Sequence, residues 1–166
     1  MLDRIKEFFR EDARPQHRGG HHFDDLQFAA AALMAEAALL DGDLGDDERR
    51  RMTDLLAERF ALPAHDAQAL VAEATGRMQE TQQIHPFVRA VTDGFDDAER
   101  VRLVEMLWEV IYVDGRVHDF EANLMRRIGG LINVTDLDIG SARRRVLARI
   151  GGADGAGANR RPGETG

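Results

Sequence analysis

Apolar residues recur along most of the chain at spacings of three and four, which place them on one face of an α-helix. Leu26, Ala30, Leu33, Ala37 and Leu40 form one such series, and the spacing returns within residues 103–110 and 120–131. A sustained alternation of apolar and polar residues, which would indicate strands, is missing. The pattern therefore predicts an all-α protein.

Helix-breaking and capping residues divide this pattern into seven or eight helices. Gly42 and Gly115 suit the left-handed residue that ends a helix, and Pro63 and Pro86 suit a first helical turn. The expected helices lie near residues 2–10, 23–40, 46–60, 63–79, 85–93, 97–113, 119–132 and 136–149. They predict a compact bundle.

One segment of the chain is repeated. Residues 33–48 align without a gap to residues 106–121, at an offset of 73 residues, and both copies contain the pattern Asp-Gly-x-Leu/Val-x-Asp-x-Glu. The matching pairs are Glu36/Glu109, Asp41/Asp114, Gly42/Gly115, Leu44/Val117, Asp46/Asp119 and Glu48/Glu121. This internal duplication predicts two helical hairpins related by a pseudo-two-fold axis.

Length and composition limit the domain organisation. The chain has 166 residues, enough for one domain with its own core, and no cysteine for disulfides or thiolate metal sites. We expect an amphipathic N-terminal segment and linker over residues 1–20, a helical domain over 21–150, and a disordered Gly-rich tail over 151–166. The start of the chain does not resemble a signal peptide, so a cytoplasmic location is expected.

Charge is distributed unevenly. Residues 21–142 hold 11 basic and 24 acidic groups, although the whole chain has a net charge of −8. Such a body repels nucleic acid and favours a cation or a basic protein partner. No apolar stretch is long enough to cross a bilayer, but residues 1–10 could contact a membrane surface. We expect Arg143, Arg144 and Arg145 to form a solvated helix C-terminus in preference to a docking patch.

Two interpretations of the duplicated loop stay open. A standard EF-hand is excluded, because glycine directly follows the first Asp and the Glu comes at position 8 instead of 12. In the first interpretation the loop only caps helices, with Glu48 and Glu121 reaching back to the N-cap amide. In the second, its carboxylates bind a divalent cation through a different geometry.

Some carboxylates are expected on the inner side of their helices. Glu36 and Glu109 lie beside the apolar stripes, and buried carboxylates need a cation, an arginine or a raised pKa. Arg51 and Arg116 are candidate partners, which would make the cluster structural. His118 with Glu121 could supply a nitrogen and an oxygen ligand, but no di-iron, zinc-helix, phosphate-loop or serine-hydrolase motif is present.

With its two acidic loops in an all-helical acidic domain, the chain resembles the TerB-like tellurite-resistance family, which is related to the N-terminal domain of DjlA-type co-chaperones. This resemblance covers roughly residues 23–150 and implies a bundle of about seven helices, a role in stress resistance and metal binding through acidic residues. The residues to which it assigns metal binding are Asp41, Asp43, Glu48, Asp114 and Glu121. Arg116 stands where the first loop has Asp43, which breaks the symmetry of the two loops.

Two functions from different classes follow. The first is a non-enzymatic stress-response protein, similar to tellurite-resistance proteins, that binds a divalent metal ion of unknown identity through its duplicated acidic loops. The alternative is a helical protein–protein interaction scaffold with no metal site. No catalytic residue and no organic cofactor is predicted in either case.

Overall fold

The computed structural model describes residues 24–81, 83–114 and 119–155. These residues form seven α-helices and two short 3₁₀ turns, with no strand among them. The α-helices are α2 (Asp25–Ala38), α3 (Asp46–Phe60), α4 (Ala64–Thr81), α5 (His85–Gly94), α6 (Asp97–Ile111), α7 (Asp119–Leu131) and α8 (Asp136–Gly155). The predicted all-α bundle is confirmed, and the expected helix over residues 2–10 lies outside the described residues.

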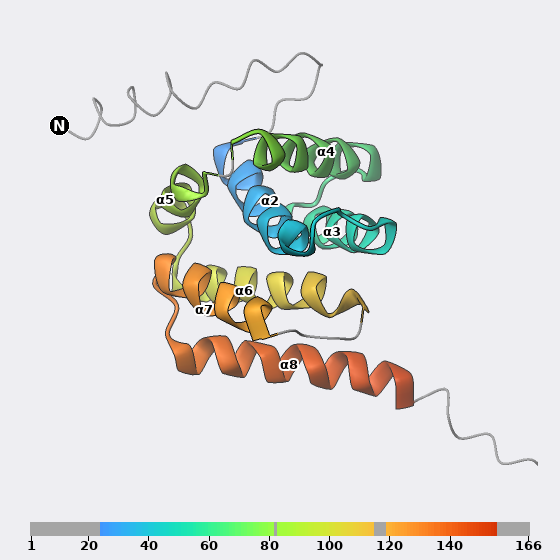
Figure 1. The fold of residues 1–166 in the computed structure, drawn as a ribbon, viewed down its shortest axis with the longest axis vertical. Coiled ribbons are helices and arrows are strands. Elements are labelled where there is room, and N and C mark those ends of the chain that lie inside the picture. Colours follow the sequence, from blue (N-terminus) through green and yellow to red (C-terminus); the bar gives the residue numbers. More distant parts are fainter. Residues whose placement is uncertain (1–23, 82, 115–118, 156–166) are drawn as a thin grey trace, which may run out of the picture.

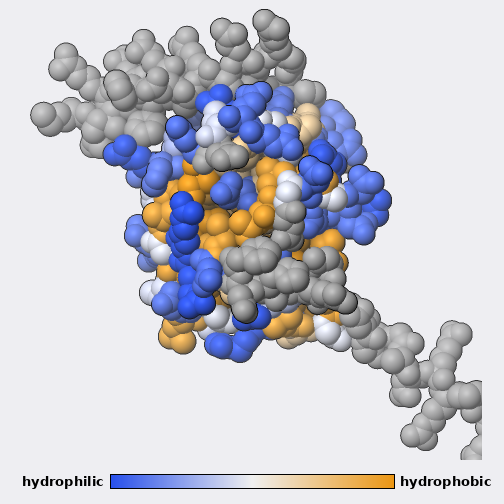
Figure 2. Space-filling view, viewed as in Figure 1, coloured by the Kyte–Doolittle hydropathy of each residue, from blue (hydrophilic) through white to orange (hydrophobic). Residues whose placement is uncertain are grey.

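The helices form two groups joined by α5. In Figure 1, α2, α3 and α4 lie together in one layer, and α6, α7 and α8 lie together in the other. Helix α2 also packs against α5, α6 and α7, so it holds the two layers together. Figure 2 shows apolar residues at the surface in the middle of this face, where the layers meet. A single hydrophobic core therefore extends through both layers.

Helices α2 and α6 are the most deeply buried elements of the bundle. In α2, the apolar residues from Ala29 to Ala35 are all buried, and their small side chains let neighbouring helices approach closely. In α6, every residue from Leu103 to Ile111 is buried, including two glutamates. A helix that is apolar all round is typical of a core position, so any charge on it needs a partner.

The predicted helix starts are formed by local capping. Asp96 accepts a hydrogen bond from the Glu99 amide at 2.8 Å, and the Glu99 carboxylate accepts one from the Asp96 amide at 2.9 Å. Asp24 and Gln27 form the same reciprocal cap at α2. These boxes satisfy amide groups that the first helical turn leaves without partners.

The two copies of the repeat have matching element bounds. Helix α2 ends in the 3₁₀ turn Leu39–Asp41 and is followed by α3, just as α6 ends in the 3₁₀ turn Tyr112–Asp114 and is followed by α7. The ends of α2 and α6, both bounds of the two 3₁₀ turns, and the starts of α3 and α7 differ by the sequence offset of 73 residues. The internal duplication and its pseudo-two-fold relation stay predictions.

The last helix is longer than expected. Helix α8 continues to Gly155, although the sequence predicts an end at residue 149. Ile150 packs against the core, and Arg149 forms ion pairs with two glutamates of α6, so tertiary contacts stabilise the helix at that point. No described helix is long and apolar enough to span a bilayer.

Candidate functional site

The first acidic loop is a capping structure. Gly42 has a φ of 116°, which favours glycine because L side chains rarely adopt it. The amide of Gly45 donates to the Glu48 carboxylate at 3.0 Å, which confirms the predicted reach of Glu48 back to the helix start. Leu44 packs partly buried against the core, and Asp43 is exposed.

The second loop is described only at its ends. Asp114 closes a 3₁₀ turn, and Glu121 is the third residue of α7 and only 4% exposed. The segment between them contains Arg116 and His118, and it lies outside the described residues. The side chains of Asp41 and Asp114 also lie outside the described set, so the geometry of the five predicted ligands stays untested. Among the described residues, no group of three or more His, Asp or Glu side chains could hold a metal ion.

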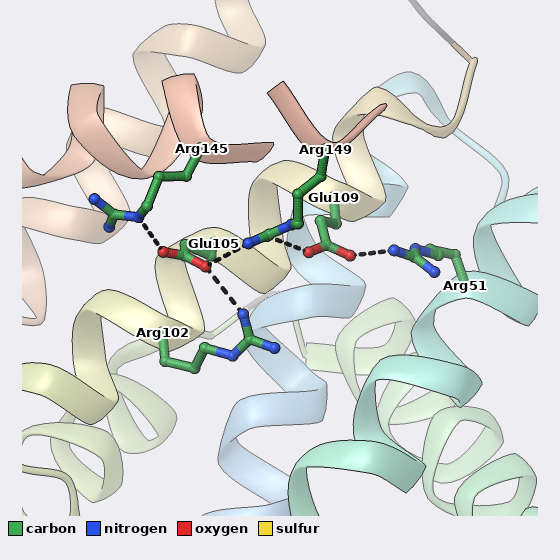
Figure 3. A network of polar contacts seen from close by, with 6 residues as sticks. All are labelled: Arg51, Arg102, Glu105, Glu109, Arg145 and Arg149. Carbon is green, nitrogen blue, oxygen red and sulfur yellow. Dashed lines mark hydrogen bonds and ion pairs between the residues drawn. The ribbon is translucent and has the colours of Figure 1, made fainter. Parts of the chain in front are cut away.

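The structure does bring carboxylates together elsewhere, on the buried helix α6. Glu105 and Glu109 are 7% and 5% exposed, and they lie one helical turn apart. Figure 3 shows them surrounded by four arginines from three helices. We call this set the arginine–glutamate cluster; it consists of Arg51 of α3, Arg102, Glu105 and Glu109 of α6, and Arg145 and Arg149 of α8.

Glu105 connects α6 to α8. One of its oxygens accepts from Nε of Arg145 at 2.5 Å. The other accepts from Nη1 of Arg102 at 3.0 Å and from Nη1 of Arg149 at 3.2 Å. Both carboxylate oxygens are therefore hydrogen-bonded to guanidinium groups, the strongest class of neutralising partner for a buried carboxylate.

Glu109 connects α8 to α3. One of its oxygens accepts from Nη2 of Arg149 at 2.5 Å, and the other accepts from Arg51. The expected inward position of Glu109 is confirmed, and its partner is Arg51, one of the two arginines named as candidates for the carboxylates. Arg149 contacts both glutamates, so the cluster is a continuous chain of ion pairs from α8 across α6 to α3 (Figure 3).

The ion pairs decide the protonation of these groups. Burial alone would raise the pKa of Glu105, but hydrogen bonds from Arg145, Arg149 and Arg102 outweigh it and hold the pKa below its usual value. Burial would likewise lower the pKa of Arg149, but the bonds to Glu109 and Glu105 raise it. The ion pairs therefore favour the charged forms of Glu105 and Arg149.

Glu36, the counterpart of Glu109 in the first copy, behaves differently. It is half-buried on α2, and burial raises its pKa, while Arg127 opposes the shift through its charge. Its expected place beside the apolar stripe is confirmed. The two copies of the repeat thus hold their inner glutamates in different electrostatic environments.

An open hollow adjoins the cluster at Glu109 and Arg51. It is lined by Tyr112, Val113 and Ile150 and by side chains of both signs of charge. The charged lining residues are Asp47, Arg50, Arg51, Asp54 and Glu109. Three acidic and two basic residues thus line the hollow.

The expectation for residues 143–145 is wrong. They lie in the middle of α8 instead of at its C-terminus. Arg143 lies 5.3 Å above the Trp108 ring and donates to the Tyr112 hydroxyl at 2.6 Å, and Arg145 binds Glu105. These arginines hold α8 against α6, because a guanidinium can stack on a ring and bind an oxygen at once.

Sequence reasoning also missed Glu105 and Arg149. A signal was present, because Glu105 and Glu109 are spaced by four residues and Arg145 and Arg149 by the same distance. Opposite charges at equal spacing on two helices can pair in register. Which two helices face each other is set by the tertiary fold, so the spacing alone could not assign the partners.

Comparisons with known proteins agree with this architecture. Residues 27–144 match the family described as tellurite resistance protein TerB. A protein of unknown function from Porphyromonas gingivalis W83, known from its crystal structure, has a similar fold with a TM-score of 0.55 and 19% sequence identity. The match covers 80% of this chain and 96% of that one. No curated protein matches the chain at a significant level.

Proposed function

The chain belongs to the TerB family, and from this membership we propose a non-enzymatic, tellurite-resistance-like role in which the acidic loops bind a divalent cation. The observation that carries the proposal is the position of the acids. Asp41 and Asp114 each close a 3₁₀ turn, and Glu48 and Glu121 are each the third residue of the following helix. Each loop thus has an Asp at the end of a 3₁₀ turn and a Glu at the third position of the next helix.

The donor chemistry fits a hard cation. The proposed ligands are all carboxylates, namely Asp41, Asp43, Glu48, Asp114 and Glu121, and oxygen donors of this kind suit Ca²⁺, Mg²⁺ and Mn²⁺. Burial of Glu121 would strengthen its attraction to a cation, because a low dielectric weakens screening.

An interaction scaffold without a metal site is the second candidate. It is favoured by the arginine–glutamate cluster, in which arginines neutralise the buried carboxylates of α6 without any metal. In that case Gly42, Gly45 and Glu48 serve only to join α2 to α3.

Calorimetry separates the two candidates. The full chain, treated with a chelator and dialysed, is titrated with Ca²⁺, Mg²⁺, Mn²⁺ and Zn²⁺. We expect saturable heat with at least one ion, and its loss in the double variant Asp114→Asn/Glu121→Gln. The matched control is Asp93→Asn/Glu80→Gln, which removes the same charges at two exposed positions and should still bind. If the wild type gave no heat of binding with any of the four ions, metal binding would be excluded and the interaction scaffold would remain.

A further inference from the structure

The arginine–glutamate cluster carries more positive charge than its structural role requires. Four arginines surround two glutamates, so the cluster has a local charge of +2 on a chain whose net charge is −8. Two arginines would suffice to neutralise two carboxylates. The excess lies on partly exposed side chains, with 40% exposure for Arg102, 48% for Arg145 and 46% for Arg149.

The cluster presents donors, not acceptors, to the solvent. All four oxygens of Glu105 and Glu109 already accept from guanidinium groups. Arg145 uses only Nε and Arg102 only Nη1, so their other N–H groups have no partner among the described residues. The glutamates thus orient the guanidiniums, and the outer surface can bind an anion but offers no ligand to a cation.

One end of the cluster is more open to an anion than the other. At the Arg51 end, Asp47 and Asp54 line the adjoining hollow and would repel a negative group. At the other end, Arg102 and Arg145 face each other across Glu105, and Arg144 lies exposed beside Arg145 on α8. Figure 3 shows Arg145, Arg149 and Arg102 around this end of the cluster.

We propose that Arg102, Arg145 and Arg149 form a docking surface for an acidic segment of a partner protein, whose Asp or Glu side chains bind the outward guanidinium N–H groups. Carboxylates fit because arginine binds them with paired, directional hydrogen bonds. The positive groups lie on two helices instead of closing around one point, which suits side chains spaced along a peptide. The docking surface does not rest on the proposed cation binding, because it uses none of the loop residues.

Nucleic acid fits this surface less well. A nucleic-acid strand carries a charge at every nucleotide and would extend past the cluster onto a body that holds 24 acidic against 11 basic groups over residues 21–142. An acidic peptide can place its charges on the cluster alone. The acidic surface around the cluster therefore favours an acidic peptide over nucleic acid.

Fluorescence anisotropy of the full chain tests the docking surface. The probe is a fluorescein-labelled peptide of alternating Glu and Gly, in buffer with a chelator so that the result is independent of any metal. We expect saturable binding that weakens as salt is raised, and no binding of the matching Lys–Gly peptide. Arg102→Gln and Arg145→Gln should each weaken binding roughly three- to tenfold, the loss of one charge-assisted contact.

Arg126→Gln is the matched control. Arg126 is exposed on α7 and bonds to Asn123, so this variant removes the same charge away from the cluster. It should leave peptide affinity within about twofold, a change too small to represent a lost contact. Unfolding midpoints of the three variants show whether a loss of binding reflects a loss of fold, because Glu105 keeps two arginines in either cluster variant.

Several results would overturn the proposal. Equal losses in Arg126→Gln and Arg145→Gln would show that only net charge matters. Tighter binding of single-stranded oligothymidine than of the peptide would identify a nucleic-acid surface instead. Displacement of the peptide by low concentrations of inorganic phosphate would indicate a compact oxyanion site, and absence of peptide binding by folded wild type would exclude the surface altogether.

Discussion

Two adjacent glutamates in the core of a small helical domain are tolerated because each carboxylate oxygen has a guanidinium partner. Glu105 accepts from three arginines and Glu109 from two, with Arg149 shared between them. Removing one member of such a buried pair leaves the other charge without compensation, which costs more than the pair contributes. The stability of the α6–α8 contact should therefore depend strongly on Glu105.

We predict that Glu105→Gln lowers the free energy of unfolding at pH 7 by about 1–3 kcal/mol, because three arginines lose their ionised partner. Arginine hydrogen bonds hold the folded-state pKa of Glu105 below its usual value, so its stabilising contribution is complete above that usual value. This contribution is lost as the pH falls through the folded pKa. Urea unfolding between pH 7 and pH 3 should thus show the wild type and the variant converging.

The exposed Glu80 provides the control for Glu105→Gln. Glu80→Gln removes the same charge from the surface of α4 and should leave stability within about 0.5 kcal/mol at every pH. A gap between wild type and Glu105→Gln that keeps its size down to pH 3 would mean that the ion pairs do not carry the effect.

At the scale of elements, α7 and α8 approach each other closely at one glycine. A Cβ built on Gly129 would lie 2.4 Å from Cδ1 and 2.9 Å from Cγ1 of the buried Ile139. Gly130, the next residue of the same helix, has nothing within 4 Å of such a Cβ. The two neighbours thus separate a packing requirement from helix propensity.

We predict that Gly129→Ala lowers the free energy of unfolding by about 1–3 kcal/mol, because the added methyl must displace Ile139 from a packed interface. Gly130→Ala should instead be neutral or stabilising by up to about 1 kcal/mol, since alanine favours the helix. Thermal and urea unfolding of both variants measures the difference. Equal effects would show that α7 and α8 adjust without strain.

Most elements of this fold could be predicted from local sequence. Helices α3, α6 and α7 begin at Asp46, Asp97 and Asp119, the positions at which the sequence predicts helix starts. Capping residues and apolar spacing are local signals, and they act within one turn. The end of α8 at Gly155, six residues beyond the expected end, was not predicted, because the Gly-rich sequence after residue 150 is not typical of a helix.

The candidate sites show the same limit at the scale of the whole molecule. The acidic loops are visible in the sequence because their residues are contiguous, and Glu109 with Arg51 could be proposed from burial and charge. The partners of Glu105 could not, since Arg145 and Arg149 are separated from it by 40 and 44 residues. Only the packing of α8 against α6 brings these charges together.

The excess of acidic residues in the chain leads to a last prediction, on how salt changes the unfolding midpoint. A net charge of −8 produces self-repulsion in the folded state, which added salt screens. We expect the unfolding midpoint to rise by about 2 °C or more between about 0.05 and about 0.5 M NaCl.

Because salt alone is expected to raise the unfolding midpoint, the proposed cation binding must be tested at constant ionic strength. At equal ionic strength, CaCl₂, MgCl₂ or MnCl₂ should raise the unfolding midpoint further than NaCl if an ion binds the folded loops, and the extra rise should grow with ion concentration. Asp114→Asn/Glu121→Gln should keep the NaCl effect and lose the extra rise. Binding at a site adds a stabilisation that ionic strength alone does not supply. If the unfolding midpoint rose equally with NaCl and with every divalent salt, the cations would act only by screening, and the proposed site would be contradicted.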